Sequence, residues 1–309
     1  MHNQSAFTVF VDESDTGKRL DVVVASVISD CSRSYAAKLI IEGHIQVQGE
    51  KKKPGYRVKA GEKVEARVPN PTSTIFEPEP IEIDILYEDE YLIVINKRAG
   101  IVVHPAPGHY SGTLVNALLH HCPDLGTISG EIRPGIVHRL DKDTSGTLVV
   151  AKNSIIHENL SAQFKSRKIK KEYLTLVHGE MKFDSGSINL PIGRHPVHRK
   201  RMSTESRKGR EAETVWKVRE RFKNATLIKV NLKTGRTHQI RVHCAAINHP
   251  VIGDPVYCAR KMGKDLQNKA ARQMLHAWRL KFFHPALQKE MSFESPIPQD
   301  MKELIKALR

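Results

Sequence analysis

The sequence predicts an α+β protein, in which a large domain with a mostly antiparallel mixed sheet flanked by helices follows a small α/β module. Short segments with strand-like apolar alternation outnumber segments with helical spacing, and the two kinds do not alternate strictly along the chain. Strict alternation is typical of a doubly wound parallel sheet, so its absence favours the α+β arrangement. The 309 residues, 39% of them hydrophobic, are enough for a sizeable core and a second small one.

The first part of the chain predicts a strand and arm over residues 1–17 and a compact module over residues 18–69. Ser32 suits the N-cap of a helix, and Gly43 suits a helix end. The prolines of residues 70–80 then predict a linker. The expected elements, in chain order, are a strand over Phe7–Val11, helices over Leu20–Ile28 and Arg33–Glu42, a strand at Ile45 and Val47, and short strands around Val58, Val64 and Val68.

Residues 81–309 predict the large domain. The expected strands are Ile83–Tyr87, Tyr91–Ile95, Thr147–Ala151, Tyr173–Val177, Thr214–Val218 and Leu227–Leu232. The expected helices are Gly112–His121, Ile155–Ser166, Thr237–Ile247 and Asp300–Leu308. Neither the Gly-x-Gly-x-x-Gly pattern nor the phosphate-loop pattern occurs, so the binding of ATP, NAD or flavin has no support.

The charge balance points to a polyanionic partner. Lys and Arg total 49 against 34 Asp and Glu, which gives a formal net charge of +15. Each phosphate that such a surface neutralises releases counterions, so nucleic acid is favoured over a merely soluble basic surface. The four cysteines form no Cys-x-x-Cys pair, which favours reduced thiols over a zinc site or disulfides. With no apolar leader and no membrane-length apolar run, the protein is expected in the cytoplasm.

Residues 134–152 hold the densest set of polar side chains. Two apolar, strand-like stretches enclose a turn with Arg139, Asp141 and Asp143. Rigid flanking strands could aim a carboxylate of this turn into a cleft, which would suit catalysis. The alternative is a solvated turn whose Asp side chains bond to nearby backbone amides, the commoner situation for an isolated Asp. The structural interpretation suits Asp143 better than Asp141.

Residues 232–243 predict a strand end, a glycine turn and a helix with Thr237 as a possible N-cap. Arg236 and Arg241 would then lie near a helix N-terminus, a suitable place to meet phosphate. Arg241 could also reach a carboxylate of the neighbouring turn. The alternative is two surface arginines with no such role.

Two other segments also allow a functional and a structural interpretation. Tyr173 begins a predicted strand after a basic stretch, and a lone Tyr there is more often an edge aromatic that caps the core. Residues 97–105 follow a strand that looks buried and could line a pocket or simply pack against the sheet. Basic residues of 194–210 fall in a predicted loop or hairpin, which could grip phosphates or be a solvated loop.

Taken together, the segments resemble the RluA/RluD-type pseudouridine synthases. The resemblance is carried, in the order and roughly the spacing of that family, by Gly100-Ile101-Val102-Val103-His104-Pro105, His138-Arg139-Leu140-Asp141 with Thr144-Ser145-Gly146, Lys171-Glu172-Tyr173, and Gly235-Arg236-Thr237-His238-Gln239-Ile240-Arg241. The N-terminal module resembles the S-four-type RNA-binding domain through Arg19-Leu20-Asp21, Ser32-Arg33, Leu39-Ile40, Gly43-His44-Ile45 and Val47-Gln48-Gly49, with Gln48 where Asn is common.

The resemblance implies an isomerase that converts specific uridines of RNA to pseudouridine after flipping the base out of its stack. It assigns the catalytic carboxylate to Asp141 and its cationic partner to Arg241. Tyr173 corresponds to the residue that packs on the flipped base and can move a proton, and Arg139 to the residue that helps to displace it. No cofactor and no metal are expected, because the uracil stays bound and no phosphoryl group moves.

RNA is the expected partner. The residues expected to contact it are Arg19, Arg33, Lys38, Lys51, Lys52, Arg199, Lys200, Arg201, Arg236 and His238. Four histidines could suggest a metal site, but their setting is basic and lacks a set of carboxylates, so structural or RNA-facing roles are expected for His104, His138, His238 and His243.

The resemblance favours large-subunit (23S) ribosomal RNA as the substrate, and a monomer is the default expectation for the working form. Three alternatives stay open. The same reaction could act on transfer RNA, the chain could be a non-catalytic ribosome-assembly protein, or Asp141 and Asp143 could belong to a metal-dependent nuclease. The last alternative predicts further clustered carboxylates, which the sequence does not show.

Overall fold

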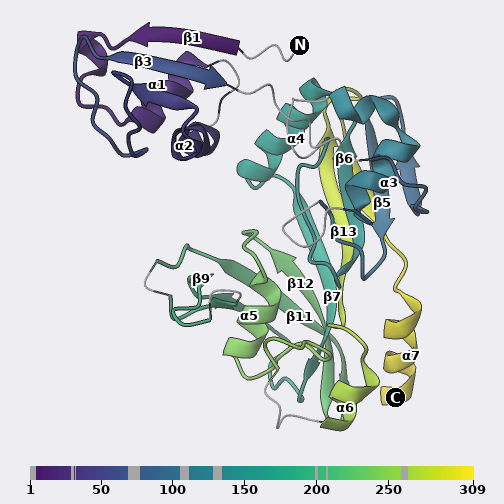
Figure 1. Cartoon of the computed structure of the whole chain (residues 1–309). Helices are drawn as coiled ribbons and strands as arrows, with labels where there is room; N and C mark the ends of the chain where they lie inside the picture. The colour runs from purple at the N-terminus through teal and green to yellow at the C-terminus, as the bar shows by residue number, and fades with distance from the viewer. Residues whose placement is uncertain are drawn as a thin grey trace. The chain divides into compact units, whose positions relative to one another are not determined.

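A computed structural model describes the chain except for residues 1–4, 29–30, 32, 69–76, 105–110, 128–133, 199–200, 207 and 259–263. The chain divides into two compact units, Met1–Ile75 and Phe76–Arg309 (Figure 1). The proposed N-cap Ser32 and most of the proposed linker lie outside the described residues. None of the helices in the described part of the chain has the length and apolar character that a membrane span requires.

The first unit packs two helices on a three-stranded antiparallel sheet with the order β1-β3-β2. Its elements are β1 (Ser5–Phe10), a short 3-10 helix (Glu13–Asp15), α1 (Leu20–Val27), α2 (Arg33–Glu42), β2 (Ile45–Val47) and β3 (Lys63–Val68). Both predicted helices are confirmed, and Gly43 follows α2 with a φ of 83°, a conformation that favours glycine. Val58 is buried but lies in no strand, because its backbone pairs with Gly17 and Lys18 instead.

The second unit is built on a mostly antiparallel mixed sheet, as predicted, and this sheet has nine strands. Its order is β4-β5-β6-β13-β7-β12-β11-β8, with β14 paired to β13. All neighbours are antiparallel except β6 and β13. The strands are β4 (Ile85–Glu88), β5 (Leu92–Lys97), β6 (Ser145–Ala151), β7 (Lys170–His178), β8 (Ser185–Asn189), β11 (Glu213–Phe222), β12 (Ala225–Leu232), β13 (Leu275–His284) and β14 (Lys289–Glu294).

The helices of this unit cover both faces of the sheet. They are α3 (Leu114–His121), α4 (Ser154–Lys165), α5 (Gln239–Ala246), α6 (Lys264–Lys269) and α7 (Gln299–Leu308), with a 3-10 helix at Pro123–Thr127. Side chains of β5 alternate between the faces, so that Ile93 and Ile95 join the α3 core while Leu92 and Val94 join the α4 core. Thr113 and Asn153 cap α3 and α4 through their side chains, which fixes where each helix begins.

The alternation along β7 separates the pocket side of the sheet from its back. Tyr173 and Val177 join the same core as α3 and α5, whereas Leu174 and Leu176 pack with α7. A small hairpin, β9 (Gly193–Arg194) with β10 (Met202–Ser203), lies within the predicted basic loop or hairpin. The sheet and its covering helices therefore hold the start of β7 and the start of α5 on one face.

Candidate active site

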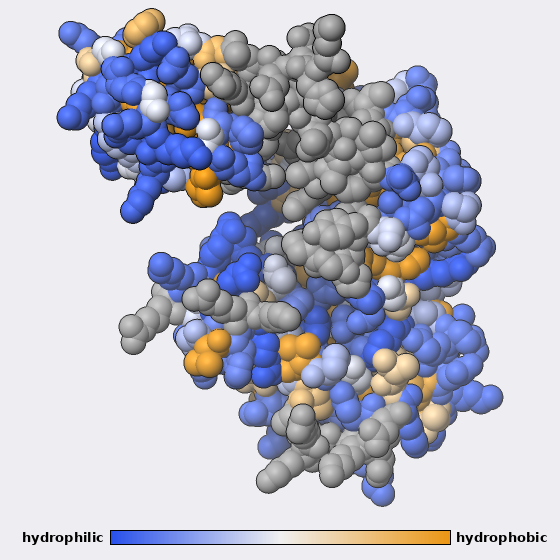
Figure 2. All heavy atoms as spheres, in the orientation of Figure 1, coloured by the Kyte–Doolittle hydropathy of each residue, from blue (hydrophilic) through white to orange (hydrophobic). Residues whose placement is uncertain are grey.

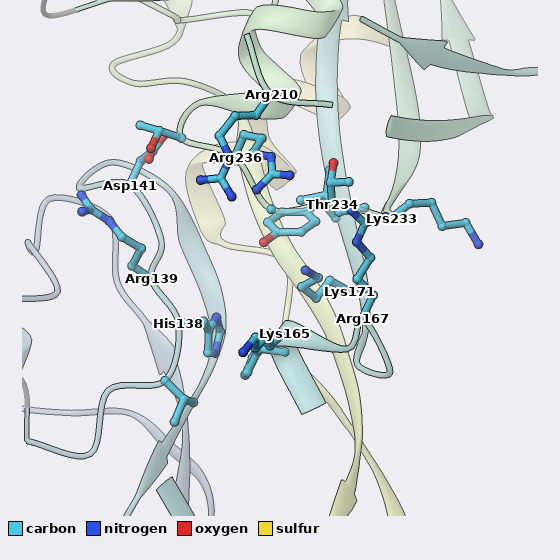
Figure 3. A pocket seen from close by; sticks show the side chains of 16 residues that line it. His138, Arg139, Asp141, Lys165, Arg167, Lys171, Arg210, Lys233, Thr234 and Arg236 are labelled. Carbon is cyan, nitrogen blue, oxygen red and sulfur yellow. The ribbon is translucent and has the colours of Figure 1, made fainter. Parts of the chain in front are cut away.

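A pocket of about 520 Å³ lies in the second unit. Its wall is formed by the loop before β6, the end of α4, the start of β7 and the turn after β12. Figure 3 shows Asp141 and Arg139 on one side of it, with Arg236 and Lys171 across from them. Three polar segments that lie far apart in the sequence therefore meet in one pocket.

Lys97, at the end of β5, holds the loop that carries Asp141. Its buried ammonium donates to the backbone carbonyls of Arg98, Ile101 and Lys142 at 2.8, 2.9 and 3.0 Å, so all three of its N–H groups are used. Burial lowers the pKa of Lys97 to about 7. The start of the segment at residues 97–105 is thus tied to the loop that carries Asp141.

His138 fixes the preceding part of the loop to the sheet. Its Nε2 accepts a hydrogen bond from the backbone N–H of Val149 at 3.1 Å, and its ring stacks on Phe164 with centroids 4.5 Å apart. Burial lowers the pKa of His138 to about 3, so the ring is neutral at physiological pH. The predicted strand before the turn is wrong, because residues 134–140 join β6 through this side chain and a single bridging pair rather than a ladder.

Arg241 joins Asp141 to a second carboxylate that the sequence analysis did not single out. Its Nη1 lies 3.0 Å from Oδ2 of Asp141, while Nε and Nη2 donate to Asp254 at 2.6 and 3.0 Å. The Arg241 side chain is 5% exposed and that of Asp254 is fully buried. Burial opposes the charge, but hydrogen bonds to Asp254 and the charge of Asp141 raise the pKa of Arg241. Among the described residues, Oδ1 of Asp141 receives no hydrogen bond, and Asp141 lines the pocket.

The helix that carries Arg241 begins one residue later than predicted. His238, not Thr237, is the N-cap, and its φ of 56° places it in the left-handed region. Gln239 secures the turn: its side chain accepts from the hydroxyl of Thr234 and the backbone N–H of Arg236 at 2.8 and 3.0 Å. The buried amide therefore shapes the glycine turn that forms one wall of the pocket.

Tyr173 lies in the pocket wall on β7 and is 9% exposed. Burial, and then the negative charge of Asp141, raise the pKa of Tyr173 far above its usual range. The phenol therefore stays protonated at neutral pH and presents an uncharged ring to the pocket. The predicted trio of Asp141, Tyr173 and Arg241 is brought together, and Arg139 projects from the same loop as Asp141, exposed at the pocket.

This arrangement agrees with the comparison to known families. The RNA pseudouridylate synthase model matches residues 91–246, a range that contains the whole pocket wall. The chain belongs to the RNA pseudouridylate synthase family. An S4 domain model matches residues 18–64, within the first unit.

Relatives of this synthase match almost its full length. An uncharacterized RNA pseudouridine synthase of Bacillus subtilis, YlyB, is 44% identical over 301 residues, 97% of each chain. The ribosomal large subunit pseudouridine synthase D of Neisseria meningitidis serogroup A is 44% identical over 95% of this chain and 79% of its own length. The protein of that name from Escherichia coli is 41% identical over 100% of this chain and 96% of its own.

A solved structure supports the same assignment. Human RNA Pseudouridylate Synthase Domain Containing 1 superposes with a TM-score of 0.56 at 27% identity, over 74% of this chain and 95% of its own. The synthase is therefore an isomerase that converts uridine in RNA to pseudouridine, and its S4 domain binds RNA.

The S4 domain of the synthase gathers several of the cations expected to contact RNA. Asp21 binds Arg19 at 2.8 Å and Arg33 at 3.3 Å, and the hydrogen bond from Arg19 lowers the pKa of Asp21. Arg19, Lys51 and Lys52 line one shallow hollow of about 770 Å³. Lys38 lies on α2. Figure 2 shows mostly hydrophilic side chains on the visible face of this unit.

The remaining expected residues belong to the second unit of the synthase. Arg236 lines the wall, and Arg201 adjoins β10. Arg199 and Lys200 lie outside the described residues. Of the two turn carboxylates, Asp143 is held through its backbone carbonyl, which accepts from Arg272. No group of three metal-ligating side chains occurs among the residues that the structure describes.

Asp254 and Lys97 were missed for different reasons. Asp254 follows the apolar pair Val251 and Ile252 in a Gly-Asp-Pro turn, a pattern that indicates a structural turn as readily as a site. Lys97 ends an apolar strand, where a lysine is typical of a solvated strand end. The only signal for Asp254 is the requirement that a buried arginine have a partner.

Proposed function

We propose that this synthase modifies large-subunit ribosomal RNA and that Asp141 is its catalytic carboxylate. The substrate is supported by the relatives of 41–44% identity that are named ribosomal large subunit pseudouridine synthase D. An enzyme acting on this RNA works where ribosomes assemble, so we expect it in the cytoplasm. We propose a monomer as the working form.

The observation that carries the catalytic assignment is the asymmetry of the Asp141 carboxylate. Arg241 is fixed by Asp254 and engages only Oδ2, so Oδ1 is the oxygen left to meet a substrate. A guanidinium at 3.0 Å in a largely buried setting stabilises a negative carboxylate. Oδ1 can then act as the nucleophile or the base that starts the cleavage of the bond between C1′ and N1 of uridine.

Tyr173 and Arg139 fit the two remaining roles. The neutral, buried ring of Tyr173 suits stacking against an uncharged uracil, and its phenol can donate a proton but has no anion to offer as a base. Arg139 is exposed on the loop of Asp141, where it can enter the RNA helix and occupy the space of the flipped base.

The far wall of the pocket suits the phosphates that flank the flipped nucleotide. Lys165, Arg167, Lys171 and Arg210 line it, and Asp141 is the only carboxylate among the lining residues. Burial, and then the charge of Arg167, lower the pKa of Lys171. A phosphodiester would relieve both effects, because it supplies the anion that the wall lacks.

The substrate assignment is tested by mapping pseudouridines in ribosomal RNA from a strain lacking the gene. We expect specific sites of large-subunit RNA to become unmodified. The wild-type gene should restore them, and the gene with Asp141→Asn should not. Large-subunit RNA that keeps all its pseudouridines, with sites lost from transfer RNA instead, would overturn the substrate assignment but not the reaction.

A further inference from the structure

Tyr257 connects the β9–β10 hairpin to the N-cap of α5, which lies beside Asp141. It follows the Gly253–Asp254 turn, and its hydroxyl accepts the backbone N–H of Met202 in β10 at 2.9 Å. The same hydroxyl lies 2.8 Å from Nδ1 of His238. One side-chain oxygen thus joins the basic hairpin to the residue that begins α5.

The ring of Tyr257 lies against two arginines. The guanidinium of Arg241 is 5.1 Å from its centroid and that of Arg201 is 5.6 Å away. Arg201 also donates to the backbone carbonyl of Val256, and the backbone N–H of Tyr257 donates to Asp254 at 3.0 Å. The ring therefore contacts both the partner of Asp141 and an expected RNA-contacting residue.

The contacts of the Tyr257 hydroxyl suit one tautomer of His238. The oxygen already accepts the N–H of Met202, so its own hydrogen is available to donate to Nδ1, which requires Nδ1 to be unprotonated. Burial lowers the pKa of His238, so its ring is neutral and its own hydrogen is on Nε2. Nε2 lies 3.9 Å from Oδ2 of Asp141, which is the same oxygen that Arg241 binds.

The backbone of His238 supports a role beyond packing. Its φ of 56° and ψ of 22° are left-handed, a conformation that costs energy for any residue with a Cβ. Such strain persists when the surroundings enforce it, and it gathers at functional sites. Here it directs the imidazole between Tyr257 and Asp141.

We infer that Tyr257 is a positioning residue that couples the basic β9–β10 hairpin to Asp141 through His238. RNA that contacts Arg201 and the hairpin steadies Tyr257, Tyr257 fixes the tautomer and orientation of His238, and the Nε2–H of His238 restrains Oδ2. Oδ1 then keeps its direction toward the substrate. This inference rests on the proposed role of Asp141.

The test is a double-mutant cycle of Tyr257→Phe and His238→Asn. Phenylalanine keeps the ring between the arginines and removes only the hydroxyl, while asparagine tolerates the left-handed backbone of residue 238. The readouts are the single-turnover rate at saturating enzyme and the dissociation constant for the RNA, both measured below the lowest unfolding midpoint of the set. Tyr87→Phe is the matched control, because it removes a hydroxyl bonded to Asp89 at 2.8 Å away from the pocket.

We expect Tyr257→Phe to lower the single-turnover rate about tenfold, the equivalent of one hydrogen bond, with the dissociation constant changed less than about twofold. The double variant should be no slower than His238→Asn alone, and Tyr87→Phe should match the wild type. Additive losses in the double variant, an unchanged rate in Tyr257→Phe, or a loss confined to the dissociation constant would each overturn the inference.

The link to the hairpin is tested with Arg201→Gln. In the wild-type background we expect this variant to weaken RNA binding and to lower the single-turnover rate. In the Tyr257→Phe background, Arg201→Gln should weaken RNA binding but leave the single-turnover rate unchanged, because the hydrogen bond between residue 257 and His238 is already absent. An equal loss of rate in both backgrounds would overturn the coupling. The assignment of Asp141 is judged separately, since an active Asp141→Asn enzyme would remove the proposed function whatever the cycle shows.

Discussion

Arg241 is buried between two carboxylates whose surroundings differ. Asp254 is fully buried and binds it with both oxygens, while Asp141 is 22% exposed and offers it one. The first carboxylate therefore fixes the guanidinium and the second is held by it. The carboxylate that we propose to be catalytic can therefore face the pocket, while Asp254 neutralises the buried guanidinium.

Removing Asp254 should therefore harm both stability and activity. Asp254→Asn leaves the buried guanidinium with one anionic partner, and breaking a buried pair costs about 3–5 kcal/mol. Glu220→Gln is the matched control, because Glu220 binds Arg309 with the same two-bond geometry but that arginine is 63% exposed. It should cost less than about 1 kcal/mol. Urea unfolding measures the free energy of unfolding of both variants. Equal decreases in the two variants would contradict the account.

Lys97 gives a prediction with a defined direction in pH. Burial lowers its pKa from 10.5 to about 7 in the folded chain. Between these values the unfolded chain binds a proton that the folded chain does not, so the free energy of unfolding contributed by Lys97 rises with pH. We expect the wild type to gain stability relative to Lys97→Met as the pH rises from about 7 to 10. The difference in free energy of unfolding between the wild type and Lys97→Met is the measured quantity. A difference that stays constant or falls over this pH range would contradict the prediction.

Among the secondary-structure elements, those with clear periodicity were predicted well. The helices α1, α2, α3, α4 and α7 and the strands β5, β7 and β12 lie close to their expected ranges. Strands β8, β13 and β14 and helix α6 were missed. β13 is buried on both faces over much of its length, so its apolar residues do not alternate, and β14 is mostly charged and polar.

Of the site, the sequence indicated Asp141, Tyr173 and Arg241, which the fold brings together. It did not indicate Asp254, Lys97 or Tyr257, because their importance comes from contacts across the fold. The start of α5 was misplaced by one residue for a related reason. Thr237 is the better N-cap by residue type, but the tertiary contacts of His238 place that residue at the cap in a left-handed conformation.

The one parallel contact of the sheet depends on a glycine of β6. Gly146 has a φ of 116° and pairs with Ala277 of β13, whose carbonyl oxygen would lie 2.2 Å from an added Cβ. Gly146→Ala must therefore move a central strand. Gly112 is the control, because its φ of 67° is also positive but no atom lies within 4 Å of an added Cβ.

We expect Gly112→Ala to cost about 1–2 kcal/mol, the penalty of a left-handed backbone. Gly146→Ala should cost clearly more or prevent folding. Thermal unfolding followed by circular dichroism compares them. Similar midpoints for the two variants would show that β6 and β13 do not approach as closely as described.

For the whole molecule, the net charge of +15 includes basic residues in the S4 domain and in the pocket wall, and we expect both sets to contact RNA. Each phosphate that a cation neutralises contributes to the salt dependence of RNA binding. For the RNA association constant, the plot of log K against log salt concentration has a negative slope. The double variant Lys165→Gln/Arg167→Gln should reduce the magnitude of this slope by about 2 for duplex-like RNA.

The control for this prediction is a pair of exposed lysines away from the pocket. Lys182→Gln/Lys302→Gln removes the same charge and should leave the slope nearly unchanged. Filter-binding titrations over a range of salt concentrations measure both. Equal decreases in slope would show that net charge, rather than the pocket wall, sets the affinity.

The most direct test of the account is the release of tritium from RNA labelled at carbon five of uridine. Asp141→Asn should release none above background while binding the RNA with nearly the wild-type dissociation constant. Asp143→Asn, on the same loop, should retain most of the activity, since Asp143 is held through its backbone carbonyl. Appreciable release by Asp141→Asn, or its loss in Asp143→Asn alone, would contradict the assignment of Asp141 as the catalytic carboxylate.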